Sequence, residues 1–155
     1  MKVIDTREYV SVLRELVHEG KEVSMMITGS SMSPFLIHQR DMIVFKAPDR
    51  GLRRGDMVFY QRDDGRFVMH RIYKIGMEGF YMLGDAQIEI EGPLRRDQIF
   101  ALIVKVRRKN KWYQEGDFLW EFFADSWIKL LPIRKVLIKL YTFIDRVKNK
   151  RDKKN

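Results

Sequence analysis

The sequence contains no cysteine, three histidines and four prolines in 155 residues. Without cysteine, the chain can form no disulfide, thiolate nucleophile, iron–sulfur cluster or cysteine-type zinc site. The three histidines show no HxH or HExxH spacing, so no histidine zinc site is expected. A glycine-rich phosphate loop is also missing, and the sequence therefore gives no reason to expect a metal, a nucleotide or any other cofactor.

Long apolar runs are missing as well. The first 20 residues carry a charge every few positions, which is unlike a secretory signal peptide. No stretch of 18 residues is poor enough in charge to predict a transmembrane helix. Hydrophobic residues nevertheless make up 45% of the chain, and its length suits one domain with a core of its own. We expect a protein that is soluble or that lies on a membrane surface.

The net charge of +9 is concentrated at one end of the chain. Residues 1–128 carry 20 basic and 19 acidic side chains, whereas residues 129–155 carry 10 basic and 2 acidic ones. A nucleic-acid-binding domain usually spreads its basic groups over a folded face. The nearly neutral body of this chain therefore argues against nucleic acid as a partner.

The spacing of apolar residues predicts one short helix followed by a β domain. Helical spacing covers residues 6–18, with Asp5 or Thr6 as the N-cap and Gly20 as the end. Short β-favouring segments follow, separated by turn signals such as the Asp-Gly pair at 64–65. The expected strands are 22–27, 41–46, 56–60, 66–75, 79–83 and 98–106. Together they predict a mostly β fold built as an antiparallel sheet, barrel or sandwich.

From residue 117 the pattern becomes helical, and Pro132 is expected to break or kink the helix. The sequence predicts an amphipathic helical appendage at 117–148, attached to a β domain of residues 1–116, and a disordered basic tail at 149–155. Three interpretations of the appendage stay open: packing on the β domain, lying in a membrane interface, or binding nucleic acid. The membrane surface is favoured, through residues 117–150, because tryptophan and phenylalanine beside a lysine-rich end suit an anionic interface.

Three residues have the chemistry of a serine hydrolase. A nucleophilic serine needs an exposed hydroxyl, a base within reach and N–H donors for the oxyanion. Ser31 lies among small residues that suit the first and third needs, and His70 is a suitable base because its unperturbed pKa is about 6.5. Asp85 follows at a strand end, from which a carboxylate can hold the imidazole tautomer. Taken singly, these are simplest as loop, strand and turn residues; taken together, they predict a Ser–His–Asp site.

At these residues the sequence resembles the type I signal peptidase family. Ser31-Met32-Ser33-Pro34 matches the family's Ser-Met-x-Pro nucleophile motif. The later motifs are similar, in the same order, to GDMVFY (Gly55–Tyr60), MHRIYKI (Met69–Ile75), LGDAQ (Leu83–Gln87) and a closing strand, LRRDQIFALIVKV. The likeness covers roughly residues 24–108. The usual bacterial enzymes have a lysine where this chain has His70, which is similar to the endoplasmic-reticulum, archaeal and some sporeformer enzymes.

The resemblance implies a serine endopeptidase with a signal-peptidase-like antiparallel β domain. It makes Ser31 the nucleophile, His70 the general base and Asp85 the acidic partner, with the backbone N–H of Ser31 as the oxyanion donor. The further oxyanion and substrate-binding residues would be Gly29, Ser30 and Met32. The implied substrate is a leader or signal peptide of a preprotein, bound as an added strand and cleaved after small residues through an acyl-enzyme.

Two other functions stay open. The first is a peptide-binding or peripheral membrane module that keeps the fold with little or no catalysis. The second is a self-cleaving regulator, although the related repressor peptidases use lysine at the position of His70. His38, Lys46 and Lys74 are weaker candidates for a base, and His18 is expected to be solvated. The expected location is the membrane periphery, with the side open, or the cytoplasm if the C-terminal helix packs on the domain.

Overall fold

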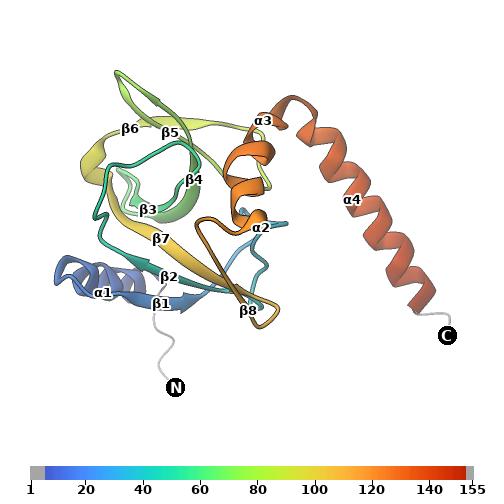
Figure 1. The fold of residues 1–155 in the computed structure, drawn as a ribbon, viewed down its shortest axis with the longest axis horizontal. Coiled ribbons are helices and arrows are strands. Elements are labelled where there is room, and N and C mark those ends of the chain that lie inside the picture. The colour runs from blue at the N-terminus through green and yellow to red at the C-terminus, as the bar shows by residue number, and fades with distance from the viewer. Residues whose placement is uncertain (1–5, 153–155) are drawn as a thin grey trace.

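The computed structural model describes residues 6–152, which form a β domain with helices at both ends (Figure 1). The proposed N-cap at Asp5 and the side chain of Thr6 lie outside the described part. The elements are α1 (Thr6–His18), β1 (Val23–Met26), β2 (Met42–Lys46), β3 (Met57–Gln61), β4 (Phe67–Gly76), β5 (Gly79–Leu83), β6 (Glu91–Leu94), η1 (Arg96–Gln98), β7 (Ile99–Arg108), β8 (Lys111–Gln114), α2 (Phe118–Glu121), η2 (Phe122–Ser126), α3 (Trp127–Lys129) and α4 (Leu131–Asp152).

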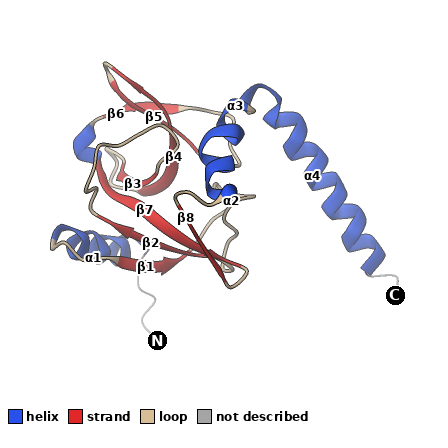
Figure 2. Ribbon diagram, viewed as in Figure 1, coloured by secondary structure: helices blue, strands red, loops and turns tan. Residues whose placement is uncertain are grey.

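The eight strands form one antiparallel sheet in the order β1-β2-β7-β3-β4-β5-β6, and β8 pairs with β7. Irregular registers between β2 and β7, β3 and β7, β4 and β5, and β5 and β6 interrupt the ladders. Such bulges increase the local twist, and the sheet curls strongly (Figure 2). The prediction of a mostly β, antiparallel fold with a short N-terminal helix and a C-terminal helix is confirmed.

Helix α1 has the bounds that the apolar spacing predicts. Val10, Leu13 and Val17 are buried on one face, at intervals that follow the helical repeat. The helix ends at Gly20, whose φ of 81° is the left-handed conformation that glycine adopts without strain. Bonds from the N–H groups of Gly20 and Lys21 back to the last turn complete the C-cap.

The two faces of the sheet bury separate apolar clusters. In β3, Met57 and Phe59 contribute to the larger cluster, which also contains α1 and the helices after β8. Val58 and Tyr60 point to the other face and contribute to a smaller cluster inside the curl. Alternation along a strand places successive side chains on opposite faces. A strand buried on both faces fits the continuous apolar run that this segment shows.

Strands β6 and β8 are not predicted from the sequence. The segment of β6 reads EGPL, and its Gly92-Pro93 pair resembles a turn rather than a strand. The segment of β8 reads KWYQ and is mostly exposed, so it shows no alternation of apolar and polar residues. The Asp-Gly pair does form the predicted hairpin between β3 and β4, where Gly65 has a φ of 85°.

The C-terminal segment divides into a packed part and a projecting part. Trp120, Phe123 and Trp127 are buried against the sheet, with η2 inserted as a wide helical turn between α2 and α3. Pro132 lies in the first turn of α4, where its missing N–H breaks no helical bond, so the predicted interruption is confirmed. Beyond Ile138 the side chains are exposed, and α4 projects away from the domain (Figure 1).

Helix α4 continues through Asp152, so residues 149–152 are helical where the sequence predicts disorder. Lys150 and Arg151 lie in its last turn. Cationic side chains are favourable there because the carbonyl end of a helix carries partial negative charge.

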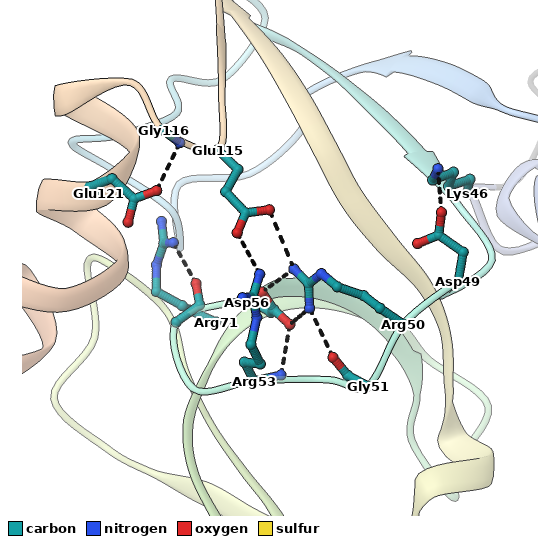
Figure 3. A network of polar contacts seen from close by, with 11 residues as sticks. Lys46, Asp49, Arg50, Gly51, Arg53, Asp56, Arg71, Glu115, Gly116 and Glu121 are labelled. Atoms are coloured by element: carbon teal, nitrogen blue, oxygen red, sulfur yellow. Dashed lines mark hydrogen bonds and ion pairs between the residues drawn. The ribbon is translucent and has the colours of Figure 1, made fainter.

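A polar network fixes the packed helices to the β domain (Figure 3). Arg50 holds Asp56 through two hydrogen bonds, and both Arg50 and Arg53 pair with Glu115 in the turn after β8. At Gly55, which has a φ of 93°, an added Cβ would lie 2.4 Å from the backbone oxygen of Ala124. The glycine therefore lets η2 approach the loop before β3 directly.

Candidate functional site

The Ser31 loop, which connects β1 to β2, lies against the segment that follows β5. The carbonyl of Ser31 accepts a 2.9 Å hydrogen bond from the N–H of Ala86. At Gly84, an added Cβ would lie 2.6 Å from the same carbonyl oxygen. This glycine therefore permits a close approach of two backbones that any larger residue would prevent.

The same segment borders His70. Arg71 of β4 pairs with Leu83 of β5, so continuing this register by one residue places Gly84 opposite His70. Ser31 and His70 are thus both neighbours of Gly84, although 39 positions separate them in the chain. The structure brings together the regions that hold the predicted nucleophile and the predicted base.

No hydrogen bond joins Ser31 Oγ to His70 among the described residues. Neither Ser31 Oγ nor His70 Nε2 has a hydrogen-bond partner within residues 6–152. Neither atom is completely buried, so solvent reaches both. Catalytic hydrogen bonds are often long without substrate and shorten when it binds. The geometry is that of a serine and a histidine in neighbouring backbone positions without direct contact.

His70 is buried and neutral. Its side chain is on the same sheet face as the paired Val58, and the residue is 3% exposed. Burial lowers the pKa of His70 to about 4, although the negative charge of Glu91 opposes part of this change. A neutral imidazole at pH 7 has one nitrogen free to accept a proton.

The polar partner of His70 is Tyr60, which the sequence does not indicate. Tyr60 Oη lies 3.1 Å from His70 Nδ1 and donates a 2.7 Å hydrogen bond to Glu91 Oε2. Glu91 in turn accepts two hydrogen bonds from Arg62, at 2.7 and 2.8 Å. Tyr60 looks like one more apolar strand residue in the sequence, and Glu91 stands beside a Gly-Pro pair, so neither attracts attention without the fold.

Asp85 has a different neighbour from the one expected. Its carboxylate accepts two hydrogen bonds from Arg71, at 2.9 and 2.8 Å, and makes none with His70 in the described part of the chain. Arg71 also donates to the carbonyl of Gly55, a bond drawn in Figure 3. Asp85 and Arg71 are each 1% exposed. Asp85 therefore forms a buried ion pair that joins the segment after β5 to β4.

The C-terminal helices are attached to this same segment. Trp127 Nε1 donates a 2.8 Å hydrogen bond to the carbonyl of Asp85. Arg134, fully buried in the first turns of α4, donates to the carbonyls of Gly84, Gln87 and Trp127 and lies over the Trp127 ring. Burial lowers the pKa of Arg134, and the nearby charge of Arg71 adds to the effect.

A cleft of about 400 Å³ opens beside Ser31. It runs between β1 and the beginning of β4, with α1 at one end, and its walls are mainly apolar. Its apolar lining includes Met25, Ile27, Met32, Phe59, Phe67 and Met69. Gly29 and Ser31 stand at its rim, whereas the exposed Ser30 does not line it.

Two of the residues expected at the oxyanion or in substrate binding, Gly29 and Met32, line this cleft. The N–H of Gly29 donates a 2.8 Å hydrogen bond to His38 Nδ1, so it is already occupied. This bond also places His38 beside the Ser31 loop, closer than its position in the sequence suggests. Met32 is buried and contributes to the floor of the cleft.

No group of three or more metal-ligating side chains occurs within residues 6–152. None of the helices in this part of the chain combines the length and the apolar character that crossing a bilayer would require.

No protein-family model matches the chain, and neither curated proteins nor solved structures show significant similarity to it. The likeness to signal peptidases therefore depends on the short motifs described above, and the site geometry is the independent observation on which a function can be argued.

Proposed function

We propose that the protein is a serine endopeptidase of the signal-peptidase type. The observation that carries this proposal is that Ser31 and His70 both border Gly84, with Ser31 at the rim of an apolar cleft. Ser31 Oγ is unpartnered and reached by solvent, as a nucleophile must be, and His70 is neutral at pH 7.

The reaction would follow the usual course of serine hydrolysis. Ser31 Oγ attacks the scissile carbonyl while His70 takes the hydroxyl proton, and the same proton then goes to the leaving amine. This step breaks the peptide bond and leaves an ester on Ser31. Water then attacks the ester, His70 again accepts and returns the proton, and the free serine is restored. By resemblance, the backbone N–H of Ser31 supports the oxyanion, since that of Gly29 is bonded to His38.

The cleft suggests how a peptide would bind. Strand β1 lies at the edge of the sheet, so an extended peptide can pair with its free side and continue toward Ser31. Met25, Met32 and Met69 line the space beside this edge, and such apolar walls suit small or aliphatic side chains. Leader or signal peptides with small residues before the cut are the substrate class that the resemblance adds.

The test is the cleavage of extended leader peptides, followed by mass spectrometry of the products. Ser31→Ala and His70→Gln should each lower turnover by roughly 10³-fold or more, because removing one triad member abolishes most serine catalysis. Ser24→Ala is the matched control, since Ser24 is an exposed serine of β1 that does not line the cleft. Equal turnover in wild type and Ser31→Ala would contradict the proposal and favour a peptide-binding module on the same fold.

We also propose that the protein associates with the surface of an anionic membrane through α4. Its exposed apolar side chains fall on one face: Ile133, Val136, Leu140, Phe143, Ile144 and Val147. Lys135, Lys139, Arg146 and Lys150 form a basic strip along the side of this face, which suits an amphipathic helix at an anionic interface.

The membrane test requires a local change. Deleting residues 117–155 would also remove Trp120, Trp127 and Arg134 from the packed part of the domain. Phe143→Asp places a charge on the apolar face and should abolish sedimentation with phosphatidylserine vesicles. Thr142→Asp adds the same charge on the other side of α4 and should retain most of it. Equal sedimentation of the two variants would contradict membrane association through the apolar face.

A further inference from the structure

The proton on Tyr60 has two possible acceptors. Tyr60 Oη lies 2.7 Å from Glu91 Oε2 and 3.1 Å from His70 Nδ1. A phenol has one proton, so it can donate to one of these neighbours and must accept from the other. The direction of this short chain decides which nitrogen of His70 carries the hydrogen.

Arg62 determines the direction of the hydrogen bonds that join His70, Tyr60 and Glu91. It donates from Nε and Nη2 to the two carboxylate oxygens of Glu91, and this bidentate contact favours the ionised form. The Arg62 hydrogen bonds hold the pKa of Glu91 below its usual value, and the hydrogen bond from Tyr60 contributes in the same direction. An ionised carboxylate accepts hydrogen bonds and cannot donate one. The Tyr60 proton therefore belongs to Glu91.

His70 must then be the donor in its contact with Tyr60. Burial and the hydrogen bond to Glu91 raise the pKa of Tyr60, so its oxygen keeps its proton and accepts from His70 through a lone pair. A neutral imidazole that carries its hydrogen on Nδ1 has a bare lone pair on Nε2. Nε2 has no partner among residues 6–152 and is reached by solvent.

We propose that Tyr60 and Glu91 are positioning residues that hold His70 in the Nδ1–H tautomer, with Arg62 fixing Glu91 as the terminal acceptor. The catalytic part of this inference rests on the proposed function, because only the Nδ1–H form leaves Nε2 free to take the proton of Ser31. The tautomer itself follows from the contacts alone. A carboxylate usually contacts the histidine directly in such sites, and here a phenol lies between them.

Asp85 is not available for this role. Its two carboxylate oxygens accept the hydrogen bonds of Arg71, and the pair is buried. The charged and titratable groups of the His70 network are Tyr60, Glu91 and Arg62. Tyr60 on β3 and Glu91 on β6 therefore have the orienting role that the sequence predicts for Asp85.

The direct test is ¹⁵N NMR of the histidine side chains of the full chain at pH 7, where the two ring nitrogens report which of them is protonated. Two exposed histidines complicate the spectrum, so His18→Gln and His38→Gln are combined as the background. We expect His70 to show a protonated Nδ1 and a bare Nε2. A protonated Nε2 in this background would overturn the proposal.

Glu91→Met is the sharpest variant, because it removes the acceptor of the Tyr60 proton. Tyr60 Oη and Arg62 Nη2 both donate to Glu91 Oε2, so a glutamine oxygen at that place would keep both bonds, whereas methionine has a similar length and no oxygen. Tyr60 would then donate its proton to His70 Nδ1, which moves the ring hydrogen to Nε2. The control is Glu89→Met, which makes the same change at an exposed position two residues away. An unchanged tautomer in Glu91→Met would contradict the inference.

Tyr60→Phe removes the acceptor and should also release His70 from the Nδ1–H form. If this variant fails to fold, Glu91→Met still decides the matter, because methionine has a length similar to that of glutamate and Arg62 is partly exposed to solvent. Turnover provides the second readout: Glu91→Met should lower kcat by roughly 10²–10⁴-fold, with KM little changed, as expected for loss of a general base. If the tautomer switches as expected but Ser31→Ala cleaves as well as wild type, the proposed peptidase function is refuted. The positioning role of Tyr60 and Glu91 then still holds.

Discussion

Replacing Asp85 by asparagine should reduce stability far more than a loop substitution would. The change keeps the shape of the side chain but removes its charge, and it places an NH₂ group against the guanidinium of Arg71. Arg71 is 1% exposed, so water cannot replace the lost partner. Arg134 is fully buried nearby, and Asp85 is the negative charge that favours its ionised form. The variant therefore leaves two buried cations without this carboxylate.

The magnitude follows from the contacts. The Arg71–Asp85 pair has two charge-assisted hydrogen bonds, at 2.9 and 2.8 Å. Removing one member of a buried ion pair costs about 3–5 kcal/mol, because the remaining charge is neither solvated nor paired. Total stabilities of single domains are about 5–15 kcal/mol, so the loss would be a large fraction. In a chain of this size it corresponds to a fall in Tm of roughly 6–20 °C.

Urea denaturation at pH 7, followed by tryptophan fluorescence, measures this loss. The double variant Arg71→Met/Asp85→Leu should recover a large part of it, because neither partner of the ion pair is then left charged and alone. If Asp85 instead held the His70 tautomer, Asp85→Asn would lower turnover with a stability change below about 1 kcal/mol. That outcome would refute the structural role of Asp85.

Two more predictions concern His70 and Gly84. The pKa of His70 is about 4 in the folded protein and about 6.5 in the unfolded chain. Above pH 6.5 the imidazole is neutral in both states. As the pH falls toward 4, only the unfolded state gains the proton. Wild type should therefore lose roughly 3 kcal/mol more stability than His70→Gln between pH 6.5 and 4, measured by urea denaturation, and parallel losses would contradict the burial argument. At Gly84, alanine would place its Cβ 2.6 Å from the carbonyl oxygen of Ser31. Gly84→Ala should therefore displace the serine loop and lower kcat/KM by about 10²-fold or more. The control is Gly51→Ala, which should leave peptide cleavage unchanged because nothing lies within 4 Å of an added Cβ there.

Local rules were enough to predict most of the fold. The spacing of Val10, Leu13 and Val17 defines α1, and Gly20 ends it for a backbone reason that is visible in the sequence. The Asp-Gly pair at 64–65 predicts its hairpin in the same way. The two missed strands depend instead on tertiary pairing, because β6 contains a Gly-Pro pair and β8 has a mostly exposed side.

Partners across the fold were harder to predict than positions along the chain. The sequence places Ser31, His70 and Asp85 at element ends and within strands, but it does not show that Asp85 pairs with Arg71 rather than with His70. Two residues next to each other on a strand point to opposite faces, so a carboxylate that reaches Arg71 does not thereby reach His70. Tyr60 is also not recognisable in the sequence, because it stands within an apolar run.

Arg134 is a separate case. It belongs to the basic C-terminal segment in the sequence, yet it is buried and holds three backbone carbonyls. One signal was present: Lys135, Lys139, Arg146 and Lys150 share a helical face, and Arg134 falls outside it. A basic residue off the basic face of an amphipathic helix is a candidate for an internal role.

Trapping of an acyl-enzyme would show directly whether Ser31 is the nucleophile. Wild-type protein would be mixed with an activated ester of a short peptide ending in alanine, quenched in acid within seconds, and mapped by peptide mass spectrometry. We expect an acyl group on Ser31, strongly reduced labelling in His70→Gln and none at this position in Ser31→Ala. Labelling on another residue that persists in Ser31→Ala, or no dependence on His70, would contradict the proposed function.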